Sequence, residues 1–375
     1  MALEDLAPTA TGPVPLDRSG RPARVVRASR LPAWSLLGLG VACLGVLAAF
    51  PAFASQANTQ LLVNFFILLV MAVMWNLLAG YAGMVSIGQQ AFVGLGAYGV
   101  LVLAVNGFPT VASIPVAAVV AAAISLPISL LVFRLRGGYF AIATWVVADT
   151  AMLVISSISA VGSGTGHPVP GLSSLSPHAF GRVTYYAALI VAVLALAGAY
   201  ALLRSRLGLV LAAVRDDEVG ARSAGGRVLR ARRIVFVVAA LGCGAAGALL
   251  AVSQLQVEPS AVFNVQWSAE MIFVTLIGGI GTMEGPILGT VIFYLLQQNL
   301  ANQGAWYLII FGSVAVLVAI WAPKGIWGLL QRRFGLSLFP LAHQVQQPRD
   351  AGTGGGRPAP LAGGSPATAP EAQPG

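Results

Sequence analysis

Three acidic side chains in or beside apolar stretches are the residues of this sequence best placed for ion chemistry. Asp149 falls in the middle of one such stretch, Glu270 begins another, and Glu284 lies at an interruption in the latter. An ionisable group at membrane depth is energetically costly, so it indicates a functional role by default. Asp149 lies farthest from an expected helix end. For it we weigh a structural pairing role and a role along a solute pathway equally, whereas the two glutamates can also lie at interfaces.

Polar side chains also stand at the start of an apolar run over 84–106, which is rich in glycine. Ser86, Gln89 and Gln90 begin this run. Polar groups within a membrane span face protein or water, and glycine-interrupted segments in each half of a transporter are typical of a central pathway. Two interpretations stay open for these three residues: they line a pathway, or they form hydrogen bonds between helices.

A second glycine-rich stretch interrupts the apolar sequence near the C-terminal end. Gly281, Gly285 and Gly289 form tandem G-x-x-x-G steps, and Pro286 lacks a backbone N–H. Small residues let helices approach closely in lipid, and broken helices are tolerated where they are buried or line a cavity. The stretch therefore predicts either a tight packing corner or part of a pathway. The pathway candidates in it are Gly278, Gly279, Gly281, Thr282 and Gly285.

The segment 204–233 combines a short apolar run with charge and contains eight arginines. An apolar-then-charged helix on the cytoplasmic side can dock in a groove of a partner protein. A loop that only sets membrane topology is the alternative, but such a loop has no need of the acids at 216–218. The docking candidates are Ala213, Arg215, Asp216, Asp217, Glu218, Ala221 and Gly225.

Several kinds of chemistry are excluded by the residues available. A phosphate-binding P-loop requires a Gly-Lys pair, and the only lysine, Lys324, follows a proline. The histidines are dispersed, and Cys43 and Cys243 both lie in apolar runs. We therefore expect neither a metal nor an organic cofactor in this chain. An embedded enzyme is disfavoured as well, because the acids do not cluster and no histidine lies within a span.

The composition identifies the elements that must hold these residues. Of 375 residues, 57% are hydrophobic and only 9% are charged, with a mean hydropathy of +0.84. A soluble domain is about 45–50% apolar and about a quarter charged. We therefore predict an all-α polytopic membrane protein. Roughly 214 apolar positions allow about ten helices of about 20 residues each.

The distribution of basic residues decides the number of spans. Apolar segments are expected at about 34–54, 59–79, 84–106, 111–133, 139–161, 184–203, 234–254 and 305–322. The remaining stretch, 267–301, is about 52 Å long as one helix, too long for a single crossing. Dividing it in two gives ten spans and, by the positive-inside rule, leaves only Arg182 of 21 basic residues outside.

This topology places both termini in the cytoplasm. We expect disordered, cytoplasmic tails at 1–33 and 336–375, because both are rich in Pro and Gly. Between them, 34–335 is predicted to be one transmembrane domain, with 204–233 as its principal cytoplasmic segment.

Taken together, these stretches resemble the permease subunits of branched-chain amino-acid ABC importers of the LivM type. The resemblance covers about 60–330 and rests on the order and spacing of several motifs. These are Asn76–Gly83 with Ser86 and Gly88, Gly94–Tyr98, Arg134–Ile142, Arg215–Glu218 and Gly278–Gly289.

The resemblance implies a ten-helix, type II ABC-importer-like permease with glycine-interrupted helices in a bacterial inner membrane. It further implies a second, LivH-like permease, two cytoplasmic ATPase subunits and an external substrate-binding protein. The segment around 213–226 would be the coupling helix that docks on the ATPase. Leucine, isoleucine and valine are the expected solutes.

Gln89 departs from the family pattern, because relatives often have histidine there. Related permeases also serve urea, short amides and other small solutes, which remain alternatives. A secondary transporter driven by protons or sodium, with Asp149 as its ion site, is a further and less favoured alternative.

Overall fold

The computed structural model describes one unit of the chain, which lies within Ser29–Leu341. The described residues are 33–162, 164–171, 176–216, 220, 223, 227–300, 306–322 and 325–334. Apart from Ala33, the tails predicted at 1–33 and 336–375 lie outside them. Their disorder stays a prediction.

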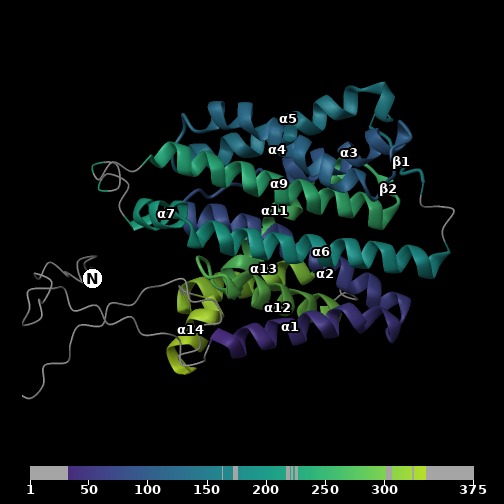
Figure 1. The fold of residues 1–375 in the computed structure, drawn as a ribbon. Helices are drawn as coiled ribbons and strands as arrows, with labels where there is room; N and C mark the ends of the chain where they lie inside the picture. Colours follow the sequence, from purple (N-terminus) through teal and green to yellow (C-terminus); the bar gives the residue numbers. More distant parts are fainter. Residues whose placement is uncertain are drawn as a thin grey trace, which may run out of the picture. The chain divides into compact units, whose positions relative to one another are not determined.

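Ten helices among the described residues occupy the places predicted for ten spans (Figure 1). They are α1 Ala33–Ala49, α2 Gln56–Asn76, α3 Gln90–Val105, α4 Ser113–Val132, α5 Gly138–Ser157, α6 Pro177–Arg204, α9 Val228–Gln254, α11 Val265–Gly278, α12 Glu284–Leu300 and α13 Trp306–Trp321. Shorter elements are η2 Phe50–Ala52, the π-helical η3 Leu77–Tyr81, η4 Ser159–Val161, α7 Arg206–Asp216, α10 Pro259–Val262, α14 Gly325–Phe334 and the paired strands β1 His167–Pro168 and β2 Gln256–Val257. The described part of the chain is therefore a helical bundle with one pair of two-residue strands, and the predicted all-α class is confirmed.

The division of 267–301 into two helices is confirmed, because α11 ends at Gly278 and α12 begins at Glu284. Six described segments are long and apolar enough to cross a membrane by themselves. They are Gln56–Tyr81, Ser113–Val132, Gly138–Ser157, Pro177–Arg204, Val228–Gln254 and Pro259–Gly278. Helices such as α3 and α12 are shorter than the about 20 residues that a crossing normally needs.

Three predicted helix starts are wrong by six or seven residues, and one of them is α9, which begins at Val228 instead of 234. The third helix was expected from 84, but α3 begins at Gln90, since Gly83 takes a positive φ of 66° and ends the preceding turn. Ser86 and Gln89 therefore lie in a connection. The sixth helix was expected from 184, but α6 begins at Pro177, where the Ser176 hydroxyl accepts from the Ala179 N–H and caps it.

Helix α14 was not predicted at all. It lies within the stretch that joins the last expected span to the C-terminal tail, and it packs against α11 and α12. Gly325 begins it with a φ of +67°, and a side chain there would overlap Gly279. The start of α14 thus rests on the connection between α11 and α12.

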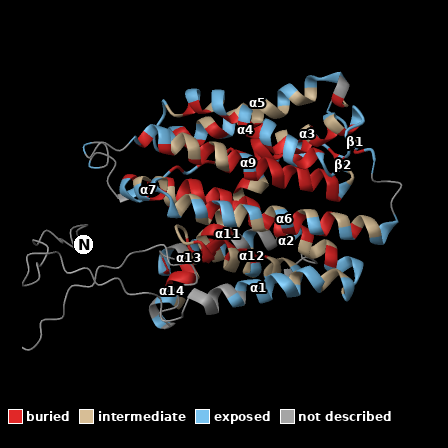
Figure 2. Cartoon of the chain, viewed as in Figure 1, coloured by how far each residue is buried: buried red, intermediate tan, exposed pale blue. Residues whose placement is uncertain are grey.

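The centre of the bundle is formed by α2, α3 and α9. Figure 2 shows α9 buried along most of its length, whereas α5 and α1 are largely exposed. Phe92 of α3 and Phe236 of α9 pack edge to face, with 5.5 Å between ring centroids. Gly96 lies against the Gly244 backbone in the same crossing. Small residues thus let two apolar helices approach closely, as expected in lipid.

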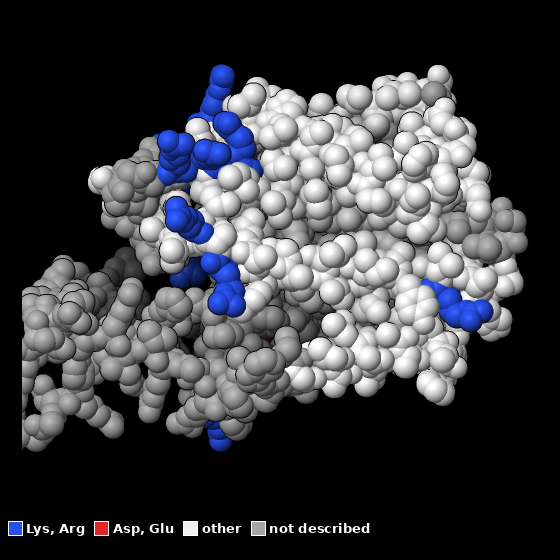
Figure 3. All heavy atoms as spheres, viewed as in Figure 1, with Lys and Arg blue, Asp and Glu red and all other residues white. Residues whose placement is uncertain are grey.

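The basic side chains gather at one end of the bundle. Figure 3 shows them around α7, the start of α9 and α14, with a single basic group at the opposite end, where α6 begins. Arg182, the one basic residue predicted to lie outside, is in the first turns of α6. This asymmetry agrees with the topology that the positive-inside rule predicts.

The close crossing of α3 and α9 generates a prediction about stability. A Cβ at Gly96 would overlap the Gly244 carbonyl oxygen, so Gly96→Ala should force the helices apart and destabilise the protein by about 3 kcal/mol. Gly198→Ala in α6 is the matched control, since no atom lies within 4 Å of its Cβ and alanine favours a helix by about 1 kcal/mol. Thermal unfolding in detergent checks both variants. Equal midpoints would contradict the close crossing.

Candidate functional site

The end of α2 is attached to the connection between α11 and α12 by the side chain of Asn76, which is 1% exposed. Its Nδ2 donates to the Thr282 carbonyl oxygen at 2.7 Å, and its Oδ1 accepts from the Gly281 N–H at 2.8 Å. One amide therefore pairs two backbone groups that the helix interruption would otherwise leave unpaired. This attachment fixes the connection against α2.

The π-helical segment η3 follows Asn76 directly and also touches the connection. A Cβ at Gly80 would lie 2.5 Å from the Gly281 nitrogen, so the two glycine backbones are in direct contact. Gly281 itself has a φ of +76°, which few residues other than glycine adopt. Short segments of π-helix occur frequently at functional sites.

Helix α7 reaches the same place through Arg215. Its Nη1 donates to the Gly80 carbonyl oxygen at 3.4 Å and would lie 3.1 Å from a Cβ at Gly281. Tyr81 lies within electrostatic range of both Arg215 and Glu284, and Glu284 is 6% exposed. We call the meeting of η3, the 279–283 connection and Arg215 the junction.

Within the junction, the glycine-rich stretch forms a tightly packed corner. Gly278 lies against the Gly285 backbone, where no side chain would fit. Thr282 donates its hydroxyl to the Gly279 carbonyl at 2.8 Å and accepts from the Gly285 N–H at 3.0 Å. The packing interpretation of this stretch is thus supported. A pathway role for Gly278, Gly279, Gly281, Thr282 and Gly285 stays a prediction.

The polar residues before α3 form a second cluster, in which Ser86, Gln89 and Gln90 are all fully buried. The Ser86 hydroxyl oxygen accepts from Gln89 Nε2 at 3.2 Å, and the Ser86 carbonyl accepts from Trp75 Nε1 at 2.8 Å. Gln90 Oε1 accepts a short hydrogen bond from the Ser268 hydroxyl of α11. These hydrogen bonds connect α2, α3 and α11, which supports in part the interpretation that these residues join helices.

Two amide atoms of this cluster lack a partner. Gln89 Oε1 and Gln90 Nε2 are buried without any hydrogen bond among the described residues. A buried polar atom left unpaired costs about 1–3 kcal/mol of stability, so each one needs an explanation, such as a bound water molecule or a role in the function. Glu270 also lies on α11, 7% exposed, and its Oε1 accepts from Gln266 Nε2 at 2.8 Å. The cluster offers one free acceptor and one free donor.

Asp149 does not join either group. It lies on the outer helix α5, half-buried, and no hydrogen bond or ion pair to it is found in the described part of the chain. Thr144, one and a half turns earlier, instead connects α5 to the cluster, because its Oγ1 accepts from the Ile87 N–H at 3.2 Å. The structural pairing role considered for Asp149 thus finds no partner among described residues.

The predicted cytoplasmic helix is present as α7. Leu211 and Val214 are buried against the bundle, whereas Ala213 is exposed. Arg215 belongs to the junction, and only the backbone of Asp216 is described. The remaining docking candidates, Asp217, Glu218, Ala221 and Gly225, lie outside the described residues. Among the described residues, no three His, Cys, Asp or Glu side chains are grouped to hold a metal ion.

Comparison with known proteins identifies the family of the chain. A family described as "Branched-chain amino acid transport system / permease component" matches residues 58–320. The chain belongs to this family. Similar proteins include the high-affinity branched-chain amino acid transport system permease proteins LivM of Salmonella typhimurium, 27% identical over 316 residues, and of Escherichia coli K12, 28% identical over 313. Each alignment covers 76% of this chain and 73% of the relative. No solved structure matches significantly.

The chain is thus a multi-pass permease component of a transport system.

One residue at the centre of the junction has no functional signature in the sequence. Asn76 was noted only as part of a family motif. The available signal was an amide in an apolar span four residues before Gly80, since such a group requires a protein partner. That partner lies more than 200 positions away, so no local pattern identifies it.

The junction predicts that Asn76 is essential for the stability of the permease. Asn76→Leu keeps the side-chain size but leaves the Gly281 N–H and the Thr282 carbonyl unpaired, so we expect a loss of about 4 kcal/mol. Asn299→Leu is the control, because Asn299 is exposed and donates only within its own helix. Thermal unfolding of both variants in detergent provides the measurement. The role given to Asn76 fails if the two variants unfold at the same temperature.

Proposed function

We propose that this chain is the transmembrane permease subunit of an ATP-driven importer of leucine, isoleucine and valine. The proposed partners are a second, LivH-like permease, two cytoplasmic ATPase subunits and an external binding protein that delivers the solute. The chain itself is proposed to carry no cofactor and to catalyse no reaction. It would lie in a bacterial inner membrane with both termini in the cytoplasm.

The observation that supports this proposal most strongly is the contact of α7 with the junction. The sequence contains no P-loop, so ATP must be bound by another subunit. A partner that binds ATP can act on this chain only through its cytoplasmic surface. Helix α7 lies at the basic end, exposes Ala213 and touches η3 and the α11–α12 connection through Arg215.

A mechanism follows from these contacts. We propose that ATP binding moves α7, together with Asp216, Asp217, Glu218, Ala221 and Gly225, which dock on the ATPase. Arg215 then passes the movement to Gly80, and the Asn76 amide passes it to the α11–α12 connection. Two interrupted helices are displaced together.

The proposed solute pathway includes the cluster around Ser86, Gln89 and Gln90. The two unpaired amide atoms would bond the solute or the water that accompanies it. Asp149 is proposed to face the pathway from the outer helix α5, because a half-buried carboxylate at mid-helix is costly against lipid.

Uptake in cells that lack the gene tests the proposal. Labelled leucine, isoleucine and valine would be supplied with and without the restored gene, with urea and a short amide in parallel and ATP depletion as the control. We expect uptake of the three amino acids to follow the gene and to fall to background without ATP. Uptake of urea or the amide alone would change the solute and keep the mechanism. Uptake that ignores ATP and follows the proton gradient would contradict the importer and favour an ion site at Asp149.

A further inference from the structure

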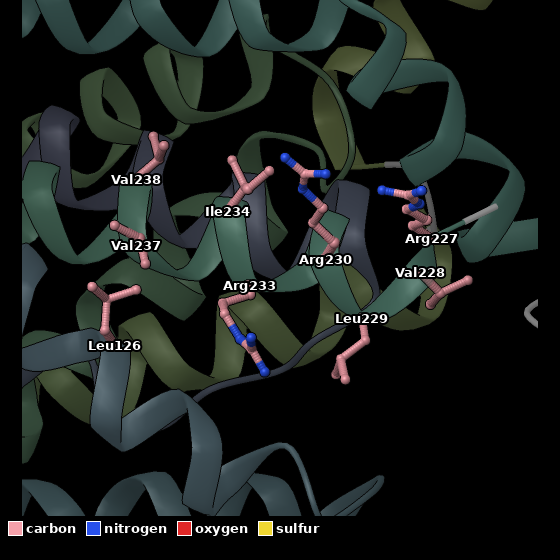
Figure 4. A pocket seen from close by; sticks show the side chains of 9 residues that line it. All are labelled: Leu126, Arg227, Val228, Leu229, Arg230, Arg233, Ile234, Val237 and Val238. Atoms are coloured by element: carbon pink, nitrogen blue, oxygen red, sulfur yellow. The ribbon is translucent and has the colours of Figure 1, made fainter.

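A groove on the outer surface of the bundle combines arginines with aliphatic walls. It has a volume of about 910 Å³ and runs along the start of α9, opposite Leu126 of α4. Arg227, Arg230 and Arg233 line its basic part (Figure 4). None of the residues that line it belongs to the junction or to the cluster around Ser86.

The three arginines have no acidic partner among the described residues. Arg233 Nε is moreover buried without a hydrogen-bond partner. Guanidinium groups recognise phosphate and carboxylate oxygens through paired N–H donors. An anion in this groove would satisfy the Arg233 donor. Figure 4 shows the Arg227 and Arg230 side chains on the other side of α9, from which they add positive charge to the same end of the groove.

The rest of the groove is apolar and follows the same helix into the bundle. Ile234 directly follows Arg233, and Val237 and Val238 lie a little more than one turn beyond it. Figure 4 shows Arg233 directed to the side of α9 on which Leu126 lies. Leu126 is 47% exposed there. The order along α9 is therefore charge first and hydrocarbon next, as in a phospholipid that stands in one leaflet.

We propose that this groove binds an anionic phospholipid of the membrane, with its phosphate at Arg233, the charges of Arg227 and Arg230 nearby, and an acyl chain along α9 and α4. Basic pockets between helices at the cytoplasmic side are suited to acidic lipid headgroups. A soluble protein partner fits the site less well, because the aliphatic walls lie within the membrane-spanning part of α9 and α4. The proposal does not depend on which solute is transported.

Native mass spectrometry of the purified full-length protein, titrated with phosphatidylglycerol or phosphatidylcholine, tests this site. We expect phosphatidylglycerol to bind preferentially. Arg230→Gln/Arg233→Gln should weaken it about 25-fold, at about fivefold for each basic residue. Arg204→Gln/Arg206→Gln removes the same charge from exposed positions at the same end, outside the groove, and should leave binding unchanged.

A second variant distinguishes the binding of a lipid from the binding of a free anion. Val237→Trp fills the apolar part and should displace phosphatidylglycerol with all arginines present, while inorganic phosphate at millimolar concentration should not compete. The proposal is overturned if all variants bind the lipid equally, or if phosphate competes and Val237→Trp has no effect. It is also overturned if Arg230→Gln/Arg233→Gln binds lipid normally but loses the ATPase subunits, because the groove would then be a protein-docking surface.

Discussion

The structure depends on the need to pair every backbone polar group in a chain surrounded by lipid. Two irregular segments lie near each other: the π-helical η3, in which α2 ends, and the 279–283 connection between α11 and α12. Interruption is possible there because the Asn76 amide pairs the Gly281 N–H and the Thr282 carbonyl. The glycines then allow the backbones to touch. Without this one side chain, the corner would contain unpaired groups in a buried position.

The same constraint connects the interior with the basic end. Arg215 brings α7 to Gly80, and Gly325 brings the start of α14 onto Gly279. Two short helices thus rest on the place where the long helices are interrupted. Because these contacts involve backbone atoms and glycines, the junction has little room to deform, and the proposed coupling relies on this rigidity.

Much of the fold can be predicted from hydrophobicity and charge, because both are patterns of residues that are near each other in the sequence. The positive-inside rule divided 267–301 correctly, and the apolar run before Arg215 predicted α7. The start of α3 was missed because Gly83 and the buried Ser86 interrupt an otherwise apolar run. Helix α14 was missed because its stretch is short and contains charge. Asn76 received no role because its partners are distant in sequence. The pathway roles of Gln89, Gln90 and Asp149 stay predictions.

The coupling of ATP hydrolysis to transport tests the central role of the junction most directly. The ratio of solute imported to ATP hydrolysed would be measured for the complete transporter in vesicles, with Arg215→Ala and with Arg206→Ala, an exposed arginine at the start of the same helix. The account predicts that Arg215→Ala keeps ATP hydrolysis but loses most transport, while Arg206→Ala behaves as the unchanged protein. An unchanged ratio in Arg215→Ala would contradict it.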